Sequence, residues 1–191
     1  VKMFGPPVPV KEDEVGQVVV GIDTTDTAGR PTGKEVSLGD DEFRRSVYVQ
    51  VRRSKPLALL DTFDEPTMEP NCEARNTSTV TPQSLLLMNN EFVVNQSQQM
   101  AERVFRRAGT DPRQQVQEAW RLAFAREATE AETNDSVALL AQQAEQFRAS
   151  AAAATPQPTG KDAAAKPDPQ RQALAVLCQA ILSANEFLYV D

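Results

Sequence analysis

The second half of the chain carries the clearest pattern of hydrophobic and polar positions. From residue 81 onward, apolar side chains recur at three- and four-residue spacing, which is typical of helices that bury one face. The apolar stripes are explained by one shared helical core, in which Trp120 is an anchor whose indole N–H needs a partner. The pattern predicts helices over residues 82–88, 91–108, 112–124, 130–148 and 169–183.

The starts of these helices are marked by capping residues. Thr81, Asp111 and Asp168 each stand directly before a proline, which is typical of a helix N-terminus because proline loses no needed N–H there. Thr129 and Glu132 have the spacing of a capping box. These signals fix where the helices are expected to begin.

The first third of the chain predicts a small β element. Residues 17–22 are a short β-branched run, and residues 45–53 alternate valines with polar side chains, so both are predicted strands. We expect them to pair as an antiparallel ribbon, joined by a long loop over residues 23–42. The expected fold class is therefore mainly α, with about five helices and a small antiparallel β element; an α+β fold is the second choice.

The length of 191 residues fits one domain. We expect an extended, proline-rich arm without a local core over residues 1–16, the β ribbon with its loop over 17–54, and a helical part over 55–191. Residues 150–168 are rich in alanine and proline and are expected to form a flexible insertion. Because the chain starts at Val1 rather than at methionine, we expect it to be part of a longer protein.

The composition excludes several kinds of chemistry. The chain has no histidine, which removes Ser-His-Asp catalysis, histidine-ligated haem and histidine-containing zinc sites. Cys72 and Cys178 are too far apart in sequence for a Cys-x-x-Cys motif. They are buried apolar residues, one long-range disulfide, or a reactive thiol. The net charge of −7 disfavours nucleic acid as the main partner, and the sequence predicts neither a metal site nor a membrane span.

Candidate chemistry gathers in residues 60–75, where five carboxylates lie in a short, proline-containing segment. A pair drawn from Asp61, Asp64 and Glu65 could serve as acid and base in glycoside hydrolysis. The alternative is that these side chains are solvated, or pair with arginines. Arginine doublets at 44–45, 52–53 and 106–107 are typical of solvated or ion-paired faces, and an anion-binding patch is the alternative. The candidates for binding an anionic group are Arg52, Arg53 and Arg75.

Four segments together resemble a known family. They are EFRRSVYVQVRRSKPLALLDTFDEP, CEARNTSTVTPQSLLLMNNEFV, WRLAFAREATEAE and ILSANEFLYVD, in this order. Their sequence is similar to a C-terminal domain of unknown function found in large exported proteins of planctomycete bacteria. In those proteins the domain usually follows another domain of unknown function, often preceded by a planctomycete-type cytochrome c domain.

The resemblance implies that this chain is the C-terminal part of an exported protein with a periplasmic or extracytoplasmic setting. That setting strengthens the expectation of a disulfide between Cys72 and Cys178. No cofactor is expected in this chain, which has no Cys-x-x-Cys-His motif, whereas haem is possible on another domain of the full-length protein. The family supplies no catalytic residues to transfer.

Three functional hypotheses follow. The first is a non-catalytic interaction or scaffolding module, whose partners are other domains of its own polypeptide or another envelope protein. The second is a carboxylate-dependent enzyme domain acting on polysaccharide. The third is a cell-envelope assembly protein, in which the arm 1–16 or the apolar, strand-like segment 187–190 docks on a neighbouring chain. The absent histidine and the lack of a catalytic motif favour a protein that is not an enzyme.

Overall fold

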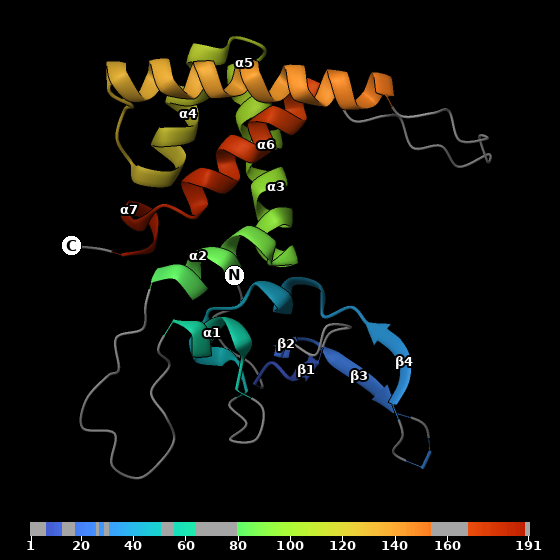
Figure 1. Cartoon of the computed structure of the whole chain (residues 1–191). Helices are drawn as coiled ribbons and strands as arrows, with labels where there is room; N and C mark the ends of the chain where they lie inside the picture. Colours follow the sequence, from blue (N-terminus) through green and yellow to red (C-terminus); the bar gives the residue numbers. More distant parts are fainter. Residues whose placement is uncertain are drawn as a thin grey trace. The chain divides into compact units, whose positions relative to one another are not determined.

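The structure is a computed structural model that describes residues 7–12, 18–25, 27–28, 31–50, 56–63, 80–153 and 168–189. Its elements fall into two compact units, Val1–Leu86 and Leu87–Asp191 (Figure 1). Helix α2 (Val80–Asn89) crosses the boundary between them. The described residues confirm the expected fold class, since helices dominate and the strands form only small antiparallel pairs.

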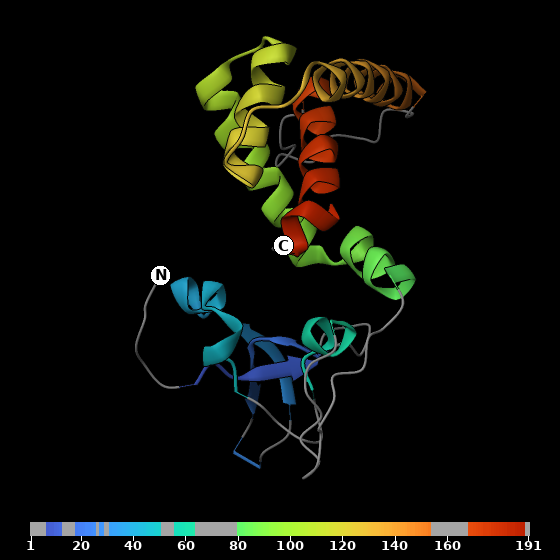
Figure 2. The same cartoon turned by 90° about the vertical axis from the view of Figure 1, so that its left-hand side faces the viewer.

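The second unit is entirely helical in its described residues. Helix α6 packs against both α3 and α5, and α4 packs against α3 and α5 on the other side of the core (Figures 1 and 2). The short helix α7 follows α6 after a tight turn. The helix bounds are α3 Glu91–Ala108, α4 Pro112–Phe124, α5 Glu130–Ala153, α6 Pro169–Leu182 and α7 Asn185–Leu188.

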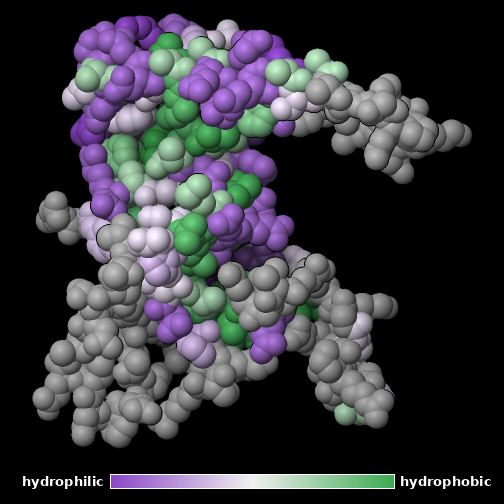
Figure 3. All heavy atoms as spheres, in the orientation of Figure 1, coloured by the Kyte–Doolittle hydropathy of each residue, from purple (hydrophilic) through white to green (hydrophobic). Residues whose placement is uncertain are grey.

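The core of the second unit is built from the predicted apolar stripes. Val104, Val116, Leu174 and Cys178 are completely buried. On the face seen in Figure 3, hydrophobic side chains gather beneath α5 and hydrophilic ones surround them. Because fully burying one side chain of the Leu or Val type is worth roughly 1.5–3 kcal/mol, this shared core is the main stabilising feature of the unit. The prediction of one shared helical core is confirmed here.

The predicted caps explain where most helices begin. Asp111 accepts a hydrogen bond from the backbone N–H of Arg113 at 2.9 Å, and Asp168 accepts from Gln170 at 3.1 Å. Glu132 accepts from the backbone N–H of Thr129 at 2.7 Å, which closes the capping box. The cap predicted for the first helix is wrong, because α2 already includes Thr81.

In the first unit, two short antiparallel strand pairs form the β element. Strand β1 (Val10–Glu12) pairs with β2 (Val18–Val20), and β3 (Ile22–Thr25) pairs with β4 (Pro31–Val36). Two 3₁₀ helices, η1 (Gly39–Phe43) and η2 (Ser46–Tyr48), and the short helix α1 (Ala58–Thr62) follow in the chain.

The predicted pairing of residues 17–22 with 45–53 is wrong. Residues 46–48 form η2, and Val49 makes only an isolated parallel bridge with Val8. The alternating valines of residues 45–53 have the local pattern of a strand, but a strand also needs a hydrogen-bonding partner. In the described residues, β1 pairs with β2 and β3 pairs with β4, so each strand pairs with its neighbour in sequence. Residues 51–53 lie outside the described residues.

Two further expectations for the N-terminal part are corrected. The loop expected over 23–42 contains most of β3, all of β4 and most of the first 3₁₀ helix, η1. The arm over 1–16 is not without a core in its described part, because Val8 and Val10 are buried. Strand pairing satisfies backbone groups of β1, β3 and β4, although β4 contains Pro31 and Gly33.

The observed unit boundary lies within α2, whereas the sequence predicted a boundary at residues 54/55 inside one domain. That all parts form one domain stays a prediction. Helix α5 reaches Ala153, five residues beyond its expected end, so the insertion predicted over 150–168 begins as helix. Residues 154–167 lie outside the described residues.

Candidate functional site

Most of the site residues predicted from sequence lie outside the described residues: Arg52, Arg53, Asp64, Glu65, Cys72 and Arg75. Asp61 is described and is an exposed residue of α1. The acid–base pair and the anion site proposed for that segment therefore stay predictions.

Cys178 lies on α6, in the core of the second unit, and is fully buried as a free thiol. Burial raises the pKa of this thiol to about 12, because a thiolate would have to form away from water. This placement agrees with the alternative that the cysteine is a buried apolar residue. Its pairing with Cys72 stays a prediction.

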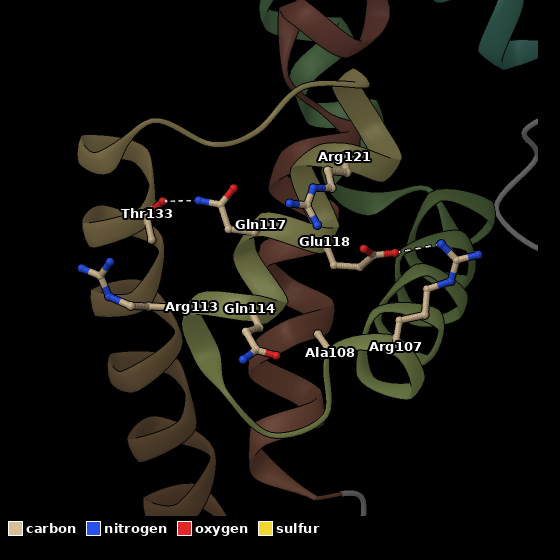
Figure 4. A pocket seen from close by; sticks show the side chains of 8 residues that line it. All are labelled: Arg107, Ala108, Arg113, Gln114, Gln117, Glu118, Arg121 and Thr133. Atoms are coloured by element: carbon tan, nitrogen blue, oxygen red, sulfur yellow. Dashed lines mark hydrogen bonds and ion pairs between the residues drawn. The ribbon is translucent and has the colours of Figure 1, made fainter.

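The second unit carries a polar hollow on the exposed face of α4, which we call the α4 hollow (Figure 4). Its volume is about 360 Å³. The end of α3 and the first turn of α5 contribute the residues beside α4. The lining residues are Arg107, Ala108, Arg113, Gln114, Gln117, Glu118, Arg121 and Thr133.

The periodicity of α4 explains why these side chains share a face. Arg113, Gln117 and Arg121 follow each other at four-residue spacing, so they lie along one side of the helix. Gln115 and Ala119 lie on the opposite side, Val116 and Trp120 lie between the two sides, and all four are buried. The same helix therefore forms part of the core with one face and the floor of the hollow with the other.

Each guanidinium group that lines the hollow is held by a carboxylate. Arg107 pairs with Glu118 at 2.8 Å across α3 and α4, and this is the one ion pair in which both partners line the hollow (Figure 4). Arg121 pairs with Glu127 at 2.6 Å, and the hydrogen bond to Glu127 raises the pKa of Arg121 above its usual value.

The third arginine, Arg113, is held on the side of α5. Its guanidinium group donates to Glu130 at 3.0 Å and to Asn134 at 2.6 Å. With this pair, the positive charges that line the hollow are balanced by neighbouring carboxylates. The α4 hollow is therefore polar and close to neutral.

Gln117 stabilises the side of the hollow where α4 is followed by α5. Its amide nitrogen donates to the carbonyl of Ala128 at 3.1 Å and to the hydroxyl of Thr133 at 3.0 Å, while its amide oxygen accepts from the N–H of Ala128 at 3.1 Å. The Thr133 hydroxyl itself donates to the carbonyl of Thr129 at 2.8 Å. These bonds fix the turn between α4 and α5, and they leave Thr133 in a structural role.

A second polar cluster, the Arg126 cluster, joins this turn to α7. Arg126 follows Ala125, which has a left-handed backbone conformation with φ of 55°. Its guanidinium group makes two hydrogen bonds to Glu132, two to Glu186 and one to the carbonyl of Glu127, at 2.7–3.1 Å. Since an arginine has five N–H donors, all of them are used, and the cluster is a structural tie with no donor left for a ligand.

The electrostatics of the Arg126 cluster follow from these bonds. The Arg126 guanidinium holds the pKa of Glu132 far below its usual range and also lowers the pKa of Glu186. The indole of Trp120 adds to the lowering at Glu132, although its buried N–H makes no well-formed hydrogen bond. The predicted anchor role of Trp120 agrees with its burial and with its edge-on contact to Phe124, at 5.9 Å between ring centres.

The α4 hollow is chemically suited to binding by hydrogen bonds. It presents guanidinium, amide and carboxylate groups side by side. In the part of the chain that the structure describes, no three metal-ligating side chains come together and no helix is long and apolar enough to span the membrane.

Sequence reasoning found little of this site. It named Arg107 within a doublet and favoured a solvated or ion-paired face, while Arg113, Gln114, Glu118 and Arg121 were not singled out. The available signal was the four-residue spacing of polar side chains beside the apolar stripe of α4. That spacing is equally typical of a solvated helix face, so it does not by itself predict a hollow.

Fold and site together define a mainly helical protein with a polar hollow on α4. Comparison with known families gives its membership: the model of the PSD1 family, described as a protein of unknown function (DUF1553), matches residues 1–140. The chain belongs to this family. The segment at 181–191, which contributed to the resemblance, lies beyond the matched residues. No curated protein and no solved structure matches the chain.

Proposed function

We propose that this chain is a non-catalytic interaction module. The observation that carries the proposal is the α4 hollow, where every lining arginine is held by a neighbouring carboxylate. A catalytic acid needs a raised pKa, whereas the two described carboxylates whose pKa departs from the ordinary value, Glu132 and Glu186, are both shifted downward.

The proposal includes a setting taken from the resemblance. The module would be the C-terminal part of an exported planctomycete protein, periplasmic or extracytoplasmic, with haem possible on another domain. Its partners would be other domains of the same polypeptide or another envelope protein. The intact mass and visible spectrum of the native protein test this setting. A mass well above 21.0 kDa with a Soret band supports it, and a mass near 21.0 kDa without visible absorption contradicts it.

The competing enzyme hypothesis is tested by turnover. The 191-residue chain is incubated with neutral and acidic polysaccharides, and the release of reducing ends is measured. We expect no release above the buffer control. Release that disappears in the folded double variant Asp61→Asn/Asp64→Asn, and persists in the variant Asp40→Asn, would overturn the non-catalytic assignment. Asp40 is a matched exposed carboxylate in η1 of the same unit.

One observation favours the assembly hypothesis as a second candidate. Phe187 and Tyr189 are exposed at the C-terminal end of the second unit. The strand expected over 187–190 is corrected, because Phe187 and Leu188 belong to α7. Deleting residues 187–191 and measuring both the melting temperature and retention on isolated cell envelopes tests the hypothesis. Lost retention at an unchanged melting temperature supports docking, and a lowered melting temperature with unchanged retention supports packing within the unit.

A further inference from the structure

We propose that the α4 hollow binds a saccharide, through adjacent hydroxyl groups that bridge the Glu118 carboxylate and the guanidinium groups beside it. The inference rests on the proposed function as a binding module and names the ligand class of its site. It is argued from the charge balance, the unused hydrogen-bonding groups and the rigidity of the hollow.

The charge balance argues against a free anion. Arg107, Arg113 and Arg121 each have a carboxylate partner within 3.0 Å, and the whole chain has a net charge of −7. An anion would be repelled by the carboxylates of Glu118, Glu127 and Glu130, which offset the charge of the three arginines. A neutral ligand does not face this repulsion.

The unused hydrogen-bonding groups alternate between donors and acceptors. In the described hydrogen bonds, Arg107 uses one terminal nitrogen, Arg121 uses one terminal nitrogen, and Glu118 uses one carboxylate oxygen. Glu118 and Arg121 both line the hollow from α4, three residues apart and therefore neighbours on the helix surface. The Gln114 amide lines the same hollow and makes no hydrogen bond among the described residues.

A hydroxyl group matches this arrangement because it both donates and accepts. One hydroxyl can donate to the free oxygen of Glu118 while its neighbour accepts from Arg107 or Arg121. Such bonds are charge-assisted, and they are about twice as strong as bonds between neutral groups. Adjacent hydroxyl groups are the defining feature of saccharides.

The hollow is also preorganised and of suitable size. Gln117 fixes the turn between α4 and α5, and the mostly buried Glu118 orients Arg107, so this part of the hollow has its shape before a ligand binds. A volume of about 360 Å³ lies within the range of roughly 300–1,000 Å³ that is common for small-molecule sites. Because the lining has only Ala108 as an apolar residue, we expect weak binding, with a Kd in about the millimolar range.

The test is an NMR titration of the ¹⁵N-labelled 191-residue chain with glucose, galactose, mannose, maltose and cellobiose. We expect shifts of the arginine Nε–H and Gln114 side-chain signals for at least one of them. Glu118→Gln and Arg107→Gln should each weaken binding about fivefold, because each removes a charge-assisted bond. Gln114→Ala should weaken it about twofold, and it provides a readout that does not disturb any described ion pair.

The matched control is Arg148→Gln. Arg148 is half-exposed like Arg107 and is paired with a glutamate, Glu145, but it lies near the end of α5 and does not line the hollow. It should leave the Kd unchanged. Equal weakening by Arg148→Gln would overturn the site assignment.

Two other outcomes would overturn the inference. The first is the absence of shifts for every saccharide up to about 0.1 M. The second is binding of inorganic sulfate that becomes tighter in Glu118→Gln, since loss of a carboxylate favours an anion but weakens a saccharide. Either result would overturn saccharide binding at the α4 hollow without contradicting the proposal that the chain is non-catalytic. Conversely, saccharide binding followed by turnover would keep the site and overturn the proposed function.

Discussion

Arg126 joins α5 and α7 at the corner that follows α4. It uses all of its donors on Glu132, Glu186 and a backbone carbonyl, and it lies over the ring of Phe124. We expect Arg126→Gln to lower the melting temperature by several degrees, because two carboxylates lose their shared partner. Arg148→Gln, which removes an exposed pair on one helix, should change it very little. Equal melting temperatures for the two variants would contradict the role assigned to Arg126.

The same cluster predicts how stability depends on pH. The pKa values of Glu132 and Glu186 are lowered in the folded chain, so the unfolded chain takes up protons first as the pH falls. Their contribution is fully present above the ordinary glutamate pKa of about 4.3 and is lost progressively below it. Melting temperatures measured between about pH 3 and pH 7 should therefore fall steeply at the acid end.

Glu132→Gln should reduce the fall in melting temperature at low pH, because a glutamine side chain does not take up a proton in this range. Glu145→Gln, which removes a highly exposed carboxylate, should leave the profile as it is. An unchanged acid-side slope in Glu132→Gln would show that other carboxylates control the acid response.

Cys178 should be inert in the folded chain. Its burial and raised pKa keep the thiol protonated and out of reach of reagents. In the variant Cys72→Ser, a thiol reagent at neutral pH should label Cys178 only after denaturation, as measured by mass. Rapid labelling of the native variant would contradict the buried placement. The non-reduced mass of the unmodified chain separately tests the predicted disulfide.

At the scale of the elements, α4 depends on its N-cap. Asp111 accepts from the N–H of Arg113, and Pro112 occupies the first turn. We expect Asp111→Ala to cost about 1 kcal/mol of stability, and Asp111→Asn to cost little, because asparagine caps nearly as well. Chemical denaturation measures both values. Equal losses in the two variants would show that the carboxylate charge, rather than capping, matters at this position.

The helices could be predicted from the sequence because their signals are local. A helix closes its hydrogen bonds within a few residues, so the cap at Asp111 and the apolar stripe of Val116 and Trp120 were sufficient to place α4 at its observed bounds. The short helices α1 and α7 were missed because one turn has no periodicity to detect.

The strands could not be predicted in the same way, because the hydrogen bonds of a strand are made to another segment of the chain. Residues 46–48 have a strand-like sequence yet form η2, while β4 contains Pro31 and Gly33 and still pairs with β3. The α4 hollow was missed for a related reason. Arg107 and Glu118 form an ion pair because the chain turns at Gly109, where α3 ends with a φ of 67°. The spacing of the two residues in the sequence does not predict this contact.

At the scale of the whole molecule, the chain belongs to the PSD1 family and consists of two units of different character. The first unit holds the described strands, and the second holds the helical core, the α4 hollow and the Arg126 cluster. We therefore expect the second unit to bind a ligand in the α4 hollow and not to catalyse a reaction.

The most direct test of this account observes the saccharide rather than the protein. The 191-residue chain is mixed with maltose or cellobiose, and saturation-transfer NMR spectra of the saccharide are recorded over many hours. We expect transfer of signal to the saccharide, weaker transfer in Arg107→Gln at the same saccharide concentration, and no new anomeric signals at any time. New anomeric signals that grow with time in the presence of the chain would contradict the central claim that this is a non-catalytic binding module.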